Sequence, residues 1–287
     1  MYRQFSQDEL EKQYNPSSNI PHIAELHARR KQLAQQAQAK LSAEYDIAYG
    51  ESPLQKFDLF FAGRGKAPIQ IFFHGGSWKG QDKSNYSFLA EPLIAENIIS
   101  INVNYDLCPQ VTIAQLIEQC RQAVLFIWTH ARLMGGDPTR ISVCGHSAGA
   151  HIAMRMIETQ WETCGAPADV IKGGVLISGL YDLEPIFQTA TNKDVRLTKE
   201  DVERESPMGR VPLRKIPLFF SCGTDDNSEF CRQTHDYANH LRQNDFPVTY
   251  VEATGHNHFT ILEALGDSRD ILGKSMVDVA LGRLQQN

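Results

Sequence analysis

The stretch Gly145-His-Ser-Ala-Gly149 decides the fold of this chain, because it places a serine between glycines at the junction of two elements. It follows an apolar run of strand type, Arg140 to Cys144, and precedes a helical run that begins at Ala150. A Gly-x-Ser-x-Gly sequence between a strand and a helix predicts a tight turn that lifts the serine hydroxyl above the sheet. Glycine tolerates such a backbone and leaves room for the neighbouring elements. The pattern therefore predicts that Ser147 is a nucleophile.

Composition limits the classes of function. The 287 residues are 42% hydrophobic, which suffices for the core of a single large domain. The 28 basic and 34 acidic residues are dispersed, and no basic run is present that would bind nucleic acid. No signal peptide and no apolar stretch long enough to span a membrane is expected. Six cysteines without paired spacing and ten histidines without ligand spacing predict reduced thiols, a cytoplasmic location and no metal.

Apolar runs alternate with helical patterns along most of the chain, which predicts an α/β fold with a mostly parallel central sheet flanked by helices. Strands are expected at 54–62, 68–73, 98–103, 140–144, 174–178, 217–222 and 247–252. Helices are expected at 22–41, 84–96, 112–134, 147–160, 228–244 and 259–284. No repeat or linker interrupts this order, so we expect one domain over residues 1–287, with a helical extension over about the first 45 residues.

Two polar segments lie outside the alternation of strands and helices. Residues 22–41 form a polar helix with a thin apolar stripe, which predicts packing on the surface of the domain. The stripe consists of Ile23, Leu26, Leu33, Ala37 and Leu41. Residues 181–211 are mostly polar, contain prolines and separate two strands. We expect these two segments to form a small lid over the site.

A serine hydroxyl needs a base, and the base needs an acid that orients it. The expected chain order is serine, then acid, then histidine. Downstream of Ser147, the run ending at Cys222 is followed by Gly223-Thr-Asp-Asp226, at the carboxyl end of a predicted strand. Asp226 is three residues past the glycine and is the favoured acid. Asp225 is the alternative, although it is also suited to cap the helix that follows.

The base is expected on the loop after the last strand. This loop reads Ala253-Thr-Gly-His-Asn-His-Phe259 and offers His256 and His258. Gly255 lets the loop turn back toward the serine, and His258 directly precedes a predicted helix that begins with apolar residues. We therefore predict His258 as the base and retain His256 as the alternative.

The negative charge that develops on the substrate oxygen needs backbone N–H donors. The predicted strand over 69–73 runs into His74-Gly-Gly-Ser-Trp78, where Gly75 and Gly76 allow a close approach of the backbone to the substrate. The amide of Ala148, next to the nucleophile, is the third expected donor. Three further residues are expected at the substrate pocket: Ser77, Trp78 and His146. A position in the core is the alternative for Trp78, and local packing or hydrogen bonding is the alternative for His146.

These motifs together identify a family. HGGSW at 74–78, GHSAG at 145–149, Gly223-x-x-Asp226 and Asn257-His-Phe259 resemble the kynurenine formamidase branch of the α/β-hydrolases. That branch is marked by an HGGxW loop and is close to the hormone-sensitive-lipase-like esterases. The resemblance covers residues from about 10 to 270 and implies an α/β-hydrolase fold, the triad of Ser147, Asp226 and His258, and no cofactor. Ser77 stands where vertebrate members tend to carry tyrosine.

The resulting hypothesis is a serine hydrolase that cleaves small carboxylic esters or aryl formamides of the N-formylkynurenine type through an acyl-enzyme. A dedicated arylformamidase of tryptophan catabolism is the first alternative, and a catalytically silent binding protein with the same fold is the second. The expected partner is a small-molecule substrate, without nucleic acid or membrane. A homodimer is left open.

Overall fold

The central feature of the computed structural model is one eight-stranded sheet with the order β1-β2-β4-β3-β5-β6-β7-β8. The structure describes residues 2–18, 20–63 and 65–284. The strands are β1 (Ala43–Ala48), β2 (Lys56–Phe60), β3 (Ala67–Phe73), β4 (Ile99–Val103), β5 (Gly136–His146), β6 (Ile171–Ile177), β7 (Leu218–Gly223) and β8 (Val248–Ala253). The pairs β1–β2 and β2–β4 are antiparallel, and the other neighbours are parallel. The prediction of a mostly parallel sheet is confirmed.

The sequence missed one strand, β1, which lies at an edge of the sheet. It fell within the segment assigned to the helical extension. Its six residues contain no continuous apolar run, and its exposed Tyr45 packs edge-on against Phe60 of β2. An edge strand is paired on one side only, so burial does not force the apolar pattern that reveals the inner strands.

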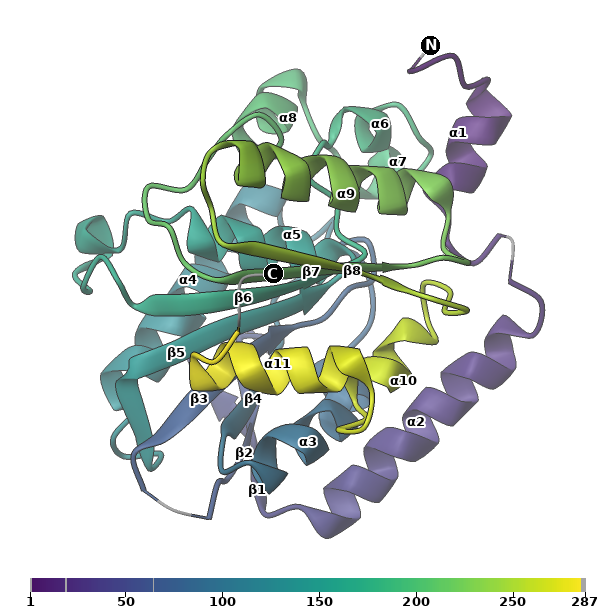
Figure 1. Cartoon of the computed structure of the whole chain (residues 1–287). Helices are drawn as coiled ribbons and strands as arrows, with labels where there is room; N and C mark the ends of the chain where they lie inside the picture. Colours follow the sequence, from purple (N-terminus) through teal and green to yellow (C-terminus); the bar gives the residue numbers. More distant parts are fainter. Residues whose placement is uncertain (1, 19, 64, 285–287) are drawn as a thin grey trace.

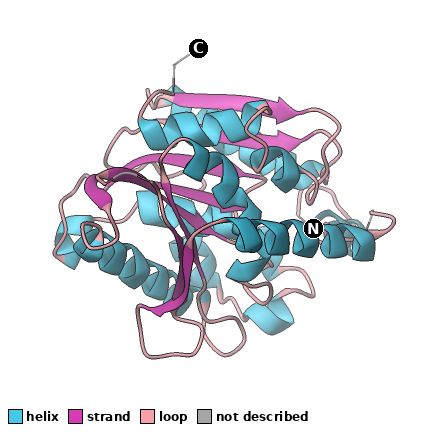
Figure 2. Cartoon of the chain, turned by 90° about the horizontal axis from the view of Figure 1, so that it is seen from below, coloured by secondary structure: helices cyan, strands magenta, loops and turns pink. Residues whose placement is uncertain are grey.

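Helices cover both faces of the sheet (Figures 1 and 2). One face carries α4 (Ile113–His130), α5 (Ala148–Ile157) and α9 (Ser228–Gln243), and the other carries α3 (Ala90–Ala95) and α11 (Ile271–Leu281). Along β3, Ile71 and Phe73 pack into the first core and Phe72 packs into the second. Because successive side chains of a strand point to opposite faces, a strand covered on both sides is continuously apolar.

Two predicted helices are subdivided. The segment expected at 84–96 begins as the 3-10 helix η1 (Lys83–Leu89) and continues as α3. The segment expected at 259–284 consists of α10 (Ile261–Leu265) and α11, and the Asp270 side chain caps the second of these. Among the described residues, no helix is both long enough and apolar enough to cross a membrane.

The helix predicted at 22–41 is α2 (Ile23–Lys40), but its buried face differs from the expected stripe. The fully buried residues are Arg30, Ala34 and Ala37, whereas Leu26 and Leu33 are only half-buried. The Gln38 side chain of α2 donates hydrogen bonds to residues of η1, which fixes the helix in this rotation. An arginine therefore occupies the packed face of a surface helix.

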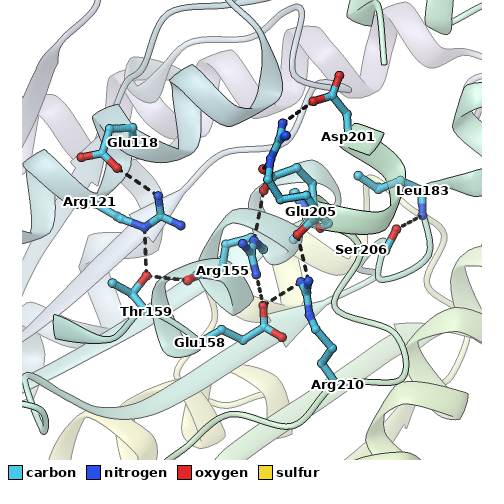
Figure 3. Close-up of polar contacts among 12 residues, drawn as sticks. Glu118, Arg121, Arg155, Glu158, Thr159, Leu183, Asp201, Glu205, Ser206 and Arg210 are labelled. Carbon is cyan, nitrogen blue, oxygen red and sulfur yellow. Dashed lines mark hydrogen bonds and ion pairs between the residues drawn. The ribbon is translucent and has the colours of Figure 1, made fainter. Parts of the chain in front are cut away.

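The insert at 181–211 contains three short helices, α6 (Glu184–Phe187), α7 (Asn192–Val195) and α8 (Lys199–Glu205). Ion pairs fasten it to α5, the helix that follows the predicted nucleophile (Figure 3). Arg155 of α5 contacts both Glu158 and Glu205, and Arg210 contacts Glu158 at 3.2 Å. Because Glu205 is almost completely buried, these pairs hold the insert at a defined position against the domain.

Candidate active site

The loop between β5 and α5 has the geometry of a nucleophile turn. Ser147 has φ 57° and ψ −125°, a backbone conformation that is costly for a residue with a side chain. A Cβ atom on Gly145 would lie 2.0 Å from the Gly149 carbonyl oxygen, and one on Gly149 would lie 2.0 Å from the Phe73 carbonyl oxygen. The Ser147 N–H donates to the carbonyl of Ile177 at 2.9 Å. Both glycines are therefore sterically required.

His258 and Asp226 form a buried pair at the carboxyl ends of β8 and β7. Their side chains are 3% and 0% exposed, and His258 Nδ1 donates to Asp226 Oδ2 at 2.9 Å. The other carboxylate oxygen accepts the Asn227 N–H at 2.7 Å. Because Nδ1 carries the donated proton, Nε2 of the neutral ring is left as a proton acceptor.

The two alternative residues lie elsewhere. Asp225 is exposed, and its N–H donates to the carbonyl of His256 at 3.0 Å. His256 lies on the wall of a separate cavity, and its Nδ1 has no hydrogen-bond partner among the described residues. The structure thus brings Asp226 to His258 and leaves Asp225 and His256 outside this pair.

The glycine loop after β3 lies against the nucleophile turn. A Cβ atom on Gly75 would lie 2.8 Å from the His146 carbonyl oxygen and 2.9 Å from the Ser147 Cβ. Gly76 has φ +112°, and a Cβ there would lie 2.2 Å from the Gly80 carbonyl oxygen. Such close contacts require glycine at both positions. Ala148, the third predicted donor, is the first residue of α5, where a backbone N–H has no partner within the helix.

Aromatic packing holds the start of this loop. The His74 ring is stacked between two tyrosines, with ring centroids 4.5 Å from Tyr105 and 6.0 Å from Tyr86. The Tyr105 hydroxyl donates to the His74 carbonyl oxygen at 2.6 Å. Burial lowers the pKa of His74, which favours its neutral form. These contacts fix the position from which the two glycines extend.

The three predicted pocket residues have different positions. Ser77 and His146 line the cavity that contains Ser147. His146 Nε2 donates to the His258 carbonyl oxygen at 2.8 Å, so it also positions the loop of the predicted base. Trp78 instead lies fully buried in the core, where its Nε1 donates to His151 Nδ1 at 3.3 Å. The indole packs edge-on against His151 of α5, away from the cavity wall.

A cavity of about 580 Å³ opens above Ser147 and His258. Its walls come from α2, from the insert and from residues before α2, and they are largely polar. The lining residues outside the motifs include Glu11, Lys12, Tyr14, Asn15, Pro16, Ser17, Ser18, His27, Arg30, Lys79, Gln81, Tyr86, Ala190, Thr191, Asp194 and Phe259. Both segments predicted as a lid thus contribute to the cavity. The residues at 11–18 were not predicted to do so.

The segment at 11–18 consists of the last residues of α1 (Gln7–Gln13) and the loop after it, and it is tied to the start of α9. The Asn227 Nδ2 donates to the carbonyl oxygens of Lys12 and Gln13 at 2.9 and 3.0 Å. The Tyr14 hydroxyl donates to Glu229 Oε2 at 2.9 Å. Since Asn227 directly follows Asp226, one short stretch orients the predicted base and also holds a wall of the cavity.

Arg30 is a further cavity residue that was not predicted from the sequence. It is 8% exposed and lies on the packed face of α2. The signal was present, because position 30 is four residues after Leu26 and three before Leu33, on the apolar side of the helix. A charged residue within an apolar stripe indicates a specific role for the charge.

Three buried histidines make folding sensitive to acid. Burial lowers the pKa of His151 to about 4 and also lowers the pKa of His74. Burial and the nearby His258 together lower the pKa of His146 well below its usual range. Neutral His151 donates from Nε2 to the Glu205 carbonyl oxygen and accepts from Trp78 at Nδ1, so a second ring proton would oppose the Trp78 N–H.

We expect the free energy of unfolding to fall as the pH drops from about 6.5 toward 4. In this window the histidines of the unfolded chain bind protons, whereas the same buried histidines of the folded protein stay neutral. Each of them lowers the free energy of unfolding by up to about 1.4 kcal/mol per pH unit. Urea unfolding at pH 7.5, 5.5 and 4.5 measures the effect. The exposed His22→Gln variant should show the same slope as the parent, and a stability that does not change between pH 7.5 and 5 would contradict the assignment.

Comparison with known proteins places the chain among hydrolases. The family BD-FAE matches residues 58–164. The kynurenine formamidase of Danio rerio is 29% identical over 289 residues, which cover 96% of this chain and 97% of that protein. A crystal structure of a proposed thioesterase from Silicibacter sp. tm1040 superposes with a TM-score of 0.83 at 28% identity and covers 93% and 98% of the two chains. The hyperthermophilic esterase of Pyrobaculum calidifontis shares the fold, with a TM-score of 0.75 at 17% identity over 91% and 93%.

These similarities and the strand order give one conclusion. The chain has the α/β-hydrolase fold and is a hydrolase homologous to kynurenine formamidases, which confirms the predicted relationship. Its relatives include kynurenine formamidases and isoprenylcysteine methylesterases, and its structural neighbours include esterases. Ester or formamide hydrolysis is the chemistry that these comparisons support.

Proposed function

We propose that this hydrolase, a homologue of the kynurenine formamidases, cleaves small carboxylic esters and aryl formamides through a covalent acyl-enzyme. Ser147 is the nucleophile, His258 the general base and Asp226 the acid that orients it. The backbone N–H groups of Gly75, Gly76 and Ala148 are the donors to the oxyanion.

In the acylation step, Ser147 Oγ attacks the substrate carbonyl carbon while His258 Nε2 takes the hydroxyl proton. The carbonyl oxygen becomes an oxyanion, which the backbone donors stabilise by roughly 3 kcal/mol each in comparable sites. His258 then gives its proton to the leaving nitrogen or oxygen. The C–N or C–O bond breaks and the amine or alcohol departs, leaving an ester between the acyl group and Ser147.

In the deacylation step, water replaces the leaving group. His258 takes one proton from the water molecule, and the resulting hydroxide attacks the acyl carbon. The bond to Ser147 Oγ breaks as His258 returns the proton to that oxygen. A formamide substrate releases formate in this step, and an ester releases its carboxylic acid. Asp226 stabilises the imidazolium that forms in each half of the cycle.

The observation that supports this proposal most strongly is the buried pair of His258 and Asp226 beside Ser147. The pair fixes the tautomer that leaves Nε2 as acceptor, and His258 and Ser147 line one cavity. Ser147, on its strained turn, also lines that cavity. A catalytically silent binding protein would need neither the strained turn nor a buried acid–histidine pair.

A dedicated arylformamidase is the second candidate, and one observation favours it. The similarity to the Danio rerio kynurenine formamidase extends over nearly the whole of both chains. A substrate panel on the purified protein separates the candidates by comparing kcat/KM for N-formylkynurenine and p-nitrophenyl acetate. A large preference for the formamide indicates the dedicated enzyme, comparable values indicate the broader hydrolase, and turnover of neither contradicts both.

Acyl-chain length should affect the rate strongly. A long acyl chain requires an apolar trench that buries its methylenes, each worth about 0.8 kcal/mol. The cavity walls from 11–18 and from the insert are instead largely polar. We expect acetyl to butyryl p-nitrophenyl esters to be cleaved far better than the dodecanoyl ester. A kcat/KM that rises steadily from four to twelve acyl carbons would indicate a lipase-like site.

We also propose a cytoplasmic location. The free state of all six cysteines supports it, because reduced thiols persist in that compartment.

A further inference from the structure

Arg30 presents an unpaired positive charge to the wall of the cavity above Ser147. Its guanidinium forms no ion pair with any residue that the structure describes. Nη2 donates to Gln81 Oε1 at 2.7 Å and to His27 Nδ1 at 3.0 Å. Nε is buried without a partner, and Nη1 makes no hydrogen bond to a described residue. Most of the donors of this arginine are thus unused.

The other packed arginines of the chain are paired. Arg121, Arg155 and Arg232 each contact a carboxylate within 3.2 Å. Arg29, the neighbour of Arg30 on α2, pairs with Glu263 at 2.8 Å. A buried charge without an opposite charge is strongly unfavourable, and natural proteins pair such groups. The exception at Arg30 therefore points to a partner that is supplied from outside the chain.

The surroundings hold Arg30 in place without neutralising it. The guanidinium carbon lies 5.1 Å from the centroid of the Tyr86 ring, a cation–π contact. Gln81 lies next to Gly80 on the glycine loop, so the hydrogen bond from Nη2 links α2 to the predicted oxyanion loop. A guanidinium fixed by a cation–π contact and by two neutral acceptors, Gln81 and His27, is preorganised to bind an anion.

The acidic groups around the cavity have other partners. Asp194 of α7 pairs with Lys79 at 2.6 Å. Glu11 Oε1 accepts the Ala190 N–H at 2.7 Å and the Gln7 side-chain amide at 2.9 Å. Lys12 adds a further positive charge to the lining. The cavity therefore has a buried positive charge at Arg30, whereas its acidic groups, Glu11 and Asp194, are bonded to other residues.

We propose that Arg30 binds a carboxylate of the substrate, so that the enzyme selects esters or formamides whose leaving group carries a carboxylate. This inference rests on the proposed function, which takes the cavity as the substrate site. The Nη1 donors of the guanidinium can form charge-assisted hydrogen bonds to a carboxylate, and such bonds are roughly twice as strong as those to a neutral amide. With a formyl group at Ser147, the charged part of the substrate belongs to the leaving amine. An aromatic amine with an amino-acid side chain has this chemistry.

Binding to an uncleavable variant tests the proposal. In the Ser147→Ala background, calorimetry compares the Kd of N-formylkynurenine with that of its carboxamide, in which an uncharged amide replaces the carboxylate. We expect the acid to bind about 10- to 100-fold more tightly, the usual range for a hydrogen-bonded charged pair. Adding Arg30→Gln should bring the two Kd values within about twofold of each other. Arg30→Lys, which keeps the charge and loses the planar guanidinium that contacts Tyr86, should give an intermediate ratio.

Arg29→Gln is the matched control, because it removes the same charge one residue away and outside the cavity. It should keep the preference for the acid. Equal affinities in the Ser147→Ala parent, binding of neither compound, or a preference that survives Arg30→Gln would each overturn the proposal. Should Arg30→Gln fail to fold, Arg30→Lys decides, since an unchanged ratio there also contradicts recognition by the guanidinium.

The wild-type enzyme separates this inference from the proposed function. Hydrolysis of p-nitrophenyl acetate, which carries no carboxylate, reports the serine chemistry alone. Hydrolysis without a preference for the acid removes the role of Arg30 and leaves the proposed function intact. A preference for the acid without any hydrolysis removes the proposed function and leaves an anion site at Arg30.

Discussion

Replacing Ser147 by alanine is expected to lower kcat for ester hydrolysis by about 10⁶-fold, the loss that removal of the nucleophile causes in template serine enzymes. The substitution deletes the only atom that forms the covalent bond. Backbone donors and substrate binding remain, so a rate roughly 10³-fold above the uncatalysed reaction should persist. Steady-state kinetics with p-nitrophenyl acetate measures the loss.

Alanine at position 147 should not impair folding, because the hydroxyl makes no contribution to the core and the strained backbone remains. Thermal unfolding of the variant serves as the control. Turnover within about tenfold of the wild type, in a folded variant, would exclude the covalent mechanism through Ser147.

Replacing Asp226 by asparagine is expected to lower kcat by about 10⁴-fold, as in the template triad. In the wild type, His258 Nδ1 donates to the Asp226 carboxylate at 2.9 Å. The asparagine side chain has the same size, but its amide group presents N–H donors to this ring nitrogen. Avoiding this clash favours the tautomer with the proton on Nε2, which cannot accept the serine proton. Kinetics with the same ester measure the effect.

Asp225→Asn is the matched control for this prediction. Asp225 is exposed, and it contacts the histidine loop through its backbone N–H, which the substitution retains. Its kcat should stay within a few-fold of the wild type. Equal losses in the two variants would leave the orienting acid unassigned, and a severe loss in Asp225→Asn alone would contradict the geometry described above.

Much of the fold could be predicted from local sequence. Strands such as β3 and β6 are buried on both faces, so their apolar runs are unambiguous. The nucleophile turn was recognisable because its glycines are sterically required, with a Cβ at Gly145 or Gly149 only 2.0 Å from a backbone oxygen. The positions of Asp226 and His258 followed from the rule that sites lie at the carboxyl ends of parallel strands. Their roles stay predictions until the variants are measured.

Other features depend on contacts between distant segments, which local patterns do not record. The edge strand β1 is revealed only by its pairing with β2. The segment at 11–18 becomes a cavity wall because Asn227 and Glu229 hold it. Trp78 follows the glycine loop directly, yet its positive φ of 57° turns the indole into the core toward His151. Arg30 looked like one of many charges on a polar helix until the packing of α2 showed that it is buried.

Labelling by a fluorophosphonate tests the central claim most directly, because this probe reacts with an activated serine. Peptide mapping by mass spectrometry after labelling of the wild-type protein should show one adduct, on the peptide that contains Ser147. His258→Ala should abolish that adduct and His256→Ala should retain it. No adduct at Ser147 in a protein that still hydrolyses p-nitrophenyl acetate, or an adduct confined to another serine, would contradict the account.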